Sequence, residues 1–148
     1  MISIQRSCLA LLLCAGAVSF ALAQNDFAQV AAKEPGAKVT ASGLVFRSLQ
    51  DGQGASPVAT DKVKVHYRGT FPDGKEFDSS FKRNQPIDFP LNAVIPCWTE
   101  GVQLMKVGGK AKLTCPPAIA YGARGAGGVI PPNATLQFEV ELIAIAGR

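Results

Sequence analysis

The 148-residue chain is long enough for one domain with its own hydrophobic core, and its 47% hydrophobic content excludes an intrinsically disordered protein. Its 15 basic and 11 acidic residues give a formal net charge of +4. Because both signs are interspersed, the sequence argues against a nucleic-acid-binding surface, which needs clustered basic residues.

The first 23 residues have the pattern of a secretory signal peptide. Arg6 supplies a positive start, residues 8–22 form an almost unbroken apolar run, and Ala21-Leu22-Ala23 matches an Ala-Xaa-Ala cleavage pattern. We therefore expect a signal peptide over 1–23, cleaved after Ala23, and a periplasmic or secreted mature protein.

Two alternatives to a cleaved signal peptide exist for this N-terminus. A membrane anchor is disfavoured because the apolar run spans about 15 residues, whereas a spanning helix needs roughly 20. Lipid attachment at Cys14 is disfavoured because the bulky Leu13 precedes it. No stable membrane anchor is expected.

Four cysteines occur, of which Cys8 and Cys14 lie in the predicted signal peptide. An even pair, Cys97 and Cys115, is left in a protein expected in an oxidising compartment, which favours a disulfide. Two buried free thiols are the alternative. The spacing is not Cys-Xaa-Xaa-Cys, so no thioredoxin-like redox motif is present.

Residues 24–42 are rich in alanine and lysine, are broken by Pro35 and Gly36, and contain few large apolar side chains. We expect a short flexible N-terminal segment there, followed by the folded domain over 43–146. A first strand is predicted over 44–49, closed by the turn-rich residues 51–54.

A second strand is predicted over 62–68, where Val63, Val65 and Tyr67 alternate with polar residues and so face inward. The Asp-Gly pair at 73–74 predicts a reversal, which returns the chain through Phe77 and Asp78 close to Tyr67. A further short strand is predicted over 87–91.

One helix of about 10 residues is predicted over 97–106, because Trp98, Val102 and Met105 recur at helical spacing between Pro96 and a Gly-Gly stop at 108–109. Strands at 110–115 and 136–142 flank a long loop at 116–133, a length that is often functional. The fold class is therefore α+β, an antiparallel, twisted β-sheet of about five strands wrapped around one short α-helix.

Most catalytic chemistries find no support in these residues. The single histidine, His66, is expected on the solvated side of its strand, so no nucleophile has an obvious base. No metal-ligand spacing or glycine-rich phosphate loop is present, so neither a metal nor a cofactor is expected. Composition alone does not decide whether the inward-facing aromatic residues pack the core or line a binding pocket. Five aromatic residues are predicted to face inward: Tyr67, Phe77, Trp98, Tyr121 and Phe138.

Six short segments, in order and spacing, resemble the FKBP-type peptidyl-prolyl cis-trans isomerases, in particular the catalytic domain of macrophage infectivity potentiator-like proteins. The resemblance covers about residues 42–145. The segments are Val65-His66-Tyr67, Asp73-Gly74-Lys75-Glu76-Phe77-Asp78-Ser79-Ser80, Val94-Ile95, Gly101-Val102, Ala120-Tyr121-Gly122 and Ile130-Pro131-Pro132-Asn133-Ala134-Thr135-Leu136.

The resemblance implies an aromatic pocket that accelerates rotation about X-Pro bonds and assists the folding of exported proteins. Its implied ligands are proline-containing unfolded or exported polypeptides and the macrolides tacrolimus and rapamycin. It also implies that the Ile95 N–H and the Tyr121 hydroxyl donate to substrate carbonyls. Catalytic roles fall on Tyr67, Phe77, Asp78 and Tyr121, and substrate contacts on Phe89, Val94, Ile95, Trp98, Val129, Ile130, Phe138 and Arg83, the last paired with Asp78.

Two departures from the family pattern bear on substrate preference. Ile87 stands where some members carry a further pocket aromatic, and the loop at 123–129 lacks bulky side chains. A periplasmic holdase with incidental isomerase activity is the alternative function. An interaction protein without activity is disfavoured, because the key pocket residues are present. We expect a monomer, since residues 24–42 are too short for a dimerising helical arm.

Overall fold

The computed structural model describes residues 26–147 and arranges seven strands in one antiparallel sheet. Its elements are β1 (Ala37–Val39), β2 (Val45–Gln50), β3 (Lys62–Thr70), β4 (Glu76–Ser79), β5 (Ile87–Pro90), η1 (Leu91–Ala93), α2 (Pro96–Gln103), β6 (Lys110–Cys115), η2 (Pro117–Ile119) and β7 (Leu136–Ile145). The predicted α+β architecture is confirmed, and β1 is a strand that the sequence analysis did not expect.

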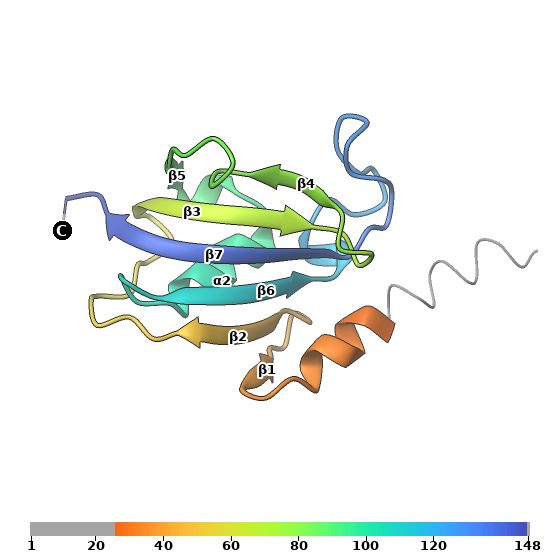
Figure 1. Cartoon of the computed structure of the whole chain (residues 1–148), viewed down its shortest axis with the longest axis horizontal. Helices are drawn as coiled ribbons and strands as arrows, with labels where there is room; N and C mark the ends of the chain where they lie inside the picture. The colour runs from red at the N-terminus through yellow and green to blue at the C-terminus, as the bar shows by residue number, and fades with distance from the viewer. Residues whose placement is uncertain (1–25, 148) are drawn as a thin grey trace, which may run out of the picture.

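The strand order is β1-β2-β6-β7-β3-β4, and β5 pairs with the opposite end of β3 from β4. Figure 1 shows α2 lying across one face of this sheet, behind β6 and β7. The two long central strands, β3 and β7, alternate buried and more exposed residues, as a strand with one covered face does. The core therefore lies between the sheet and α2.

The helix α2 begins at Pro96, one residue before the predicted start, and ends at Gln103, three residues earlier than expected. The last turn tightens, because the N–H groups of Leu104 and Met105 donate to carbonyls three residues back, those of Gly101 and Val102. The Met105 side chain is nevertheless buried. The helical spacing thus identified the inward face correctly although the final turn is not α-helical.

A disulfide joins Cys97 in α2 to Cys115 at the end of β6, with the two Cα atoms 5.8 Å apart. Both cysteines are fully buried. The predicted pairing is confirmed, and the alternative of two free thiols is wrong. The bond ties the first turn of the only α-helix between residues 37 and 147 to the centre of the sheet.

The N-terminal segment, expected to be flexible, contains secondary structure over residues 26–39 that the sequence analysis did not predict. Residues 26–32 are helical, and β1 pairs with β2. The Glu34 carboxylate binds Arg47 at 2.8 Å and Lys112 at 2.7 Å. Backbone pairing and ion pairs anchor this segment. Neither kind of interaction requires a pattern of apolar residues, and the sequence analysis relied on such a pattern.

The predicted signal peptide, residues 1–23, lies outside the residues that the structure describes. Within residues 26–147, no helix is both long enough and apolar enough to cross a membrane.

Candidate active site

A pocket of about 500 Å³ opens where β3, β4, β5 and β7 meet the N-terminal end of α2. Nine of the predicted site residues line it together: Tyr67, Phe77, Asp78, Phe89, Val94, Ile95, Trp98, Tyr121 and Phe138. The tenth lining residue, Ala93, was missed, because a single alanine before the helix carries no pattern.

Aromatic rings packed edge to face form the base of the pocket. The Trp98 indole is only 4% exposed and meets the rings of Tyr67, Phe89 and Phe138 at centroid distances of 5.3, 5.5 and 5.4 Å. Such edge-to-face contacts fix ring orientation as well as burying area. The indole Nε1–H finds no hydrogen-bond acceptor within residues 26–147, so the base of the pocket retains one unpaired donor.

Gly69 on β3 makes room for the Phe77 wall of this pocket. A Cβ at this position would lie 2.7 Å from Phe77 Cε2 and 3.0 Å from Phe138 Cε1. The ring of Phe77 packs edge-on against Phe138 with centroids 5.6 Å apart. A side chain at position 69 would therefore push this ring pair apart.

A polar constellation of Tyr67, Asp78 and Arg83 occupies the rim. The Tyr67 hydroxyl donates to Asp78 Oδ2, and Arg83 Nη1 donates to Asp78 Oδ1 at 2.7 Å. Arg83 Nη2 also donates to the Tyr67 hydroxyl oxygen at 3.3 Å. The predicted pair of Asp78 with Arg83 is therefore present, and Arg83 acts on the pocket through Asp78 rather than by lining it.

The protonation states of this constellation follow from its contacts. Burial, and then the hydrogen bond to the Asp78 carboxylate, raise the pKa of the Tyr67 hydroxyl. Burial acts to raise the pKa of Asp78, but the hydrogen bonds from Arg83 and Tyr67 outweigh it and leave that pKa below its usual value. At neutral pH the carboxyl is thus ionised and the phenol is protonated.

Two further donors stand at the pocket. Ile95 is the N-cap of α2, so its N–H precedes the helical hydrogen-bond ladder and is not used by it. Tyr121 follows η2 in the long loop, lines the pocket, and is 41% exposed. Both were predicted from the resemblance, and the structure places both at the pocket.

Val129 and Ile130 do not join these residues. They line a second cavity, together with part of the β3–β4 turn and the N-terminal helical segment. The chain passes from Tyr121 through a glycine-rich stretch, in which Ala126 and Ile130 form an isolated antiparallel bridge. This flap, residues 121–134, thus contributes one residue to the aromatic pocket and several to the second cavity.

His66 lies on the face of β3 opposite Tyr67, as predicted, but it is half-buried rather than fully solvated. Its ring stacks on Phe81 with centroids 4.7 Å apart, and its Nδ1 lies 2.9 Å from Ser80 Oγ. Ser80 Oγ also accepts the N–H of Tyr67 at 2.7 Å. The His66 side chain therefore packs against the segment that follows β4, on the face of β3 opposite Tyr67. The stacking of Phe81 on His66 could not be predicted from the sequence, because Phe81 belongs to no alternating pattern.

Among the residues that the structure describes, no cluster of three or more His, Cys, Asp or Glu side chains could hold a metal ion. The pocket residues offer apolar walls and a few directed hydrogen-bond donors. These features define a class of small α+β proteins with few helices and an apolar, aromatic pocket suited to a non-ionic group.

The comparisons narrow this class to one family. The family model for the FKBP-type peptidyl-prolyl cis-trans isomerases matches residues 53–143, and the chain belongs to this family. FkpA of Aeromonas hydrophila, an FKBP-type peptidyl-prolyl cis-trans isomerase, is 56% identical over 121 residues, which cover 82% of this chain and 45% of that protein. The 22 kDa FKBP-type isomerase of Escherichia coli K12 is 54% identical over 77% of this chain and 55% of its own length.

The same likeness holds in three dimensions. The crystal structure of FkpA from Escherichia coli superposes with a TM-score of 0.83 at 45% identity, over 87% of this chain and 60% of that chain. The chain spans about half the length of the curated relatives it matches.

Proposed function

We propose that the chain is a peptidyl-prolyl cis-trans isomerase that accelerates rotation about X-Pro bonds in unfolded or exported polypeptides. The observation that carries this proposal is the convergence of nine predicted residues on one aromatic pocket, in a chain of the isomerase family. A holdase with incidental isomerase activity is less favoured, because the relatives at about half identity are named as isomerases.

The physical reason begins with amide resonance. A planar X-Pro amide is polar and partly double-bonded, whereas the rotated transition state loses conjugation and charge separation. Water solvates the planar form better, so an apolar pocket removes that preference and favours the rotated form within a barrier of about 20 kcal/mol. Catalysis of this kind is differential binding and needs no nucleophile.

Within this proposal the pocket residues divide the work. The Trp98 base and the rings of Phe77, Phe89 and Phe138 receive the proline and exclude water. The Ile95 N–H and the Tyr121 hydroxyl hold the substrate carbonyls on either side of the rotating bond. The ionised Asp78, fixed by Arg83, orients the Tyr67 hydroxyl at the rim.

The direct test is the cis-to-trans rate of a short Leu-Pro peptide with the purified protein, with and without rapamycin or tacrolimus. A strong acceleration that either macrolide abolishes is expected. Tyr121→Phe removes one hydroxyl without altering the ring and should lower kcat/KM roughly tenfold, the value of one hydrogen bond to a reacting group. Folded protein that leaves the peptide rate at its uncatalysed value would refute the proposal.

We further propose an exported, monomeric protein. The signal-peptide pattern of residues 1–23 supports cleavage after Ala23, and residues 43–146 contain the strands and helix that build the pocket. Mass spectrometry of the protein recovered from the periplasm should give an N-terminus at Gln24. Sedimentation equilibrium should give the mass of one chain, and a stable dimer would contradict the monomer.

A further inference from the structure

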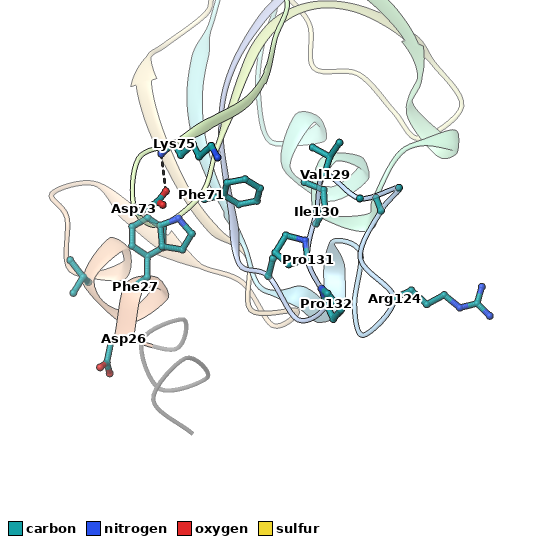
Figure 2. Close-up of a pocket in the computed structure, with 16 residues that line it drawn as sticks. Asp26, Phe27, Phe71, Asp73, Lys75, Arg124, Val129, Ile130, Pro131 and Pro132 are labelled. Carbon is teal, nitrogen blue, oxygen red and sulfur yellow. Dashed lines mark hydrogen bonds between the residues drawn. The ribbon is translucent and has the colours of Figure 1, made fainter. Parts of the chain in front are cut away.

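A second cavity of about 950 Å³ lies beside the aromatic pocket and is larger than it. Three segments distant in sequence line it: the helical residues 26–32, the β3–β4 turn, and the flap. Figure 2 shows Phe27 and Phe71 on one side and Ile130 and Pro131 on the other, while Asp26 and Arg124 extend away from the cavity. We call this cavity the groove.

The groove keeps apolar side chains in contact with solvent. Val30 from the helical segment and Val129 from the flap are 62% and 57% exposed, and both line it. Contiguous exposed apolar surface of this kind marks an interaction site more often than scattered single residues do. Both signs of charge occur along the lining, so the groove imposes no charge on what it binds.

The groove adjoins the aromatic pocket across one ring contact. Phe71 lines the groove, Phe77 lines the pocket, and the two rings contact each other with centroids 4.9 Å apart. The flap joins the same two sites from the other side, through Tyr121 at the pocket and Ile130 at the groove. One pair of phenyl rings therefore separates the two sites.

We propose that the groove binds an extended, apolar segment of the same polypeptide whose X-Pro bond occupies the pocket. This inference rests on the proposed isomerase function. Any polypeptide in the pocket continues beyond the proline, and an extended chain advances about 3.3 Å per residue, so a few residues span the separating rings. Unfolded chains carry the exposed apolar side chains that fit these walls, and tethering through the pocket raises their local concentration.

The test compares a substrate that fills only the pocket with one long enough to reach the groove. The first is a four-residue Leu-Pro peptide, and the second is an unfolded protein whose refolding is limited by prolyl isomerisation. Val30→Glu places a charge in the groove at an exposed helical position outside the pocket. Val39→Glu on β1 is the matched control, because Val39 is 59% exposed and does not line the groove.

Val30→Glu should lower kcat/KM for the long substrate about tenfold, the value of one buried valine, and leave the short peptide unchanged. Val39→Glu should change neither. An apolar peptide without proline should inhibit refolding catalysis but not the short-peptide reaction. Equal activity of Val30→Glu and the unaltered protein on the long substrate overturns the inference, as does an equal loss on both substrates.

Two other results have distinct meanings. If the unaltered protein accelerates neither substrate, the isomerase proposal itself fails, and the groove inference fails with it. If sedimentation equilibrium shows a dimer that Val30→Glu dissociates, a second copy of the chain occupies the groove, and the inference is overturned in favour of self-association.

Discussion

Asp78 connects the polar rim of the pocket to the sheet. Its two carboxylate oxygens accept from different partners, Tyr67 and Arg83, and Oδ1 also accepts the N–H of Ser79. Because the Asp78 side chain is 40% exposed, solvent weakens the pair with Arg83 as a contribution to stability. Its importance therefore lies in orienting the Tyr67 hydroxyl rather than in holding the fold.

Asp78→Asn should lower kcat/KM for a Leu-Pro peptide about tenfold, because a neutral amide both weakens the charge-assisted bond to Arg83 and ceases to fix the Tyr67 hydroxyl. The midpoint of urea unfolding should change little. Asp88→Asn is the matched control, an exposed aspartate on β5 that does not line the pocket. Equal rates for both variants would show that the Asp78 charge is irrelevant to catalysis.

Substitution of Gly69 tests whether catalysis requires the Phe77 ring to keep its present position in the pocket wall. Gly69→Ala should cost about 1–3 kcal/mol by overpacking against the Phe77 and Phe138 rings, and should lower kcat/KM as Phe77 shifts. Urea unfolding and the peptide assay measure the two effects. Phe77→Leu in the Gly69→Ala background removes the clashing ring tip and should recover stability without recovering the rate.

At the scale of secondary-structure elements, the N-terminal segment depends on one carboxylate. The hydrogen bond from Lys112 lowers the pKa of Glu34, burial opposes this, and Arg47 adds to the lowering. The two cations come from different strands, β2 and β6. Glu34 therefore holds the N-terminal segment against both strands through ion pairs. The anchoring is therefore sensitive to acid.

Since the folded pKa of Glu34 lies below its ordinary value of 4.5, the unfolded state binds the proton more readily. The stabilisation is complete above that ordinary value and is lost as the pH falls through the folded pKa. Glu34→Gln should therefore lower the free energy of unfolding by about 0.5–1 kcal/mol at pH 7. In urea unfolding the difference should shrink and vanish as the pH falls below 4.5 and through the lowered folded pKa of Glu34. A difference that persists in acid would assign the loss to packing.

The sequence predicted well those elements in which apolar side chains recur at a regular spacing. β3, β7 and α2 show apolar alternation or helical spacing because each buries one face, and Tyr67 and Trp98 were oriented correctly for that reason. β1 was missed because it is a three-residue edge strand held by backbone pairing. The groove was beyond prediction, because Val30 and Val129 come from irregularly patterned segments that only the fold brings together.

On the scale of the whole molecule, the disulfide joins the two layers of the fold. Cys97 is adjacent to Trp98 in the first turn of α2, and Cys115 ends β6 next to the long loop. The buried face of the helix is mostly apolar and belongs to the core cluster. The bond thus adds a covalent link between the base of the pocket and the sheet to the apolar packing.

Replacing both cysteines, as Cys97→Ala with Cys115→Ala, should lower the free energy of unfolding by about 3 kcal/mol, the value expected for a closed loop of 18 residues. Urea unfolding with and without reductant measures this, since reductant should destabilise the unaltered protein to the same level and leave the double variant unaffected. If apolar packing alone seats Trp98, kcat/KM below the transition will match that of the unaltered protein. A lower rate in fully folded double variant would instead show that the disulfide positions the base of the pocket for catalysis.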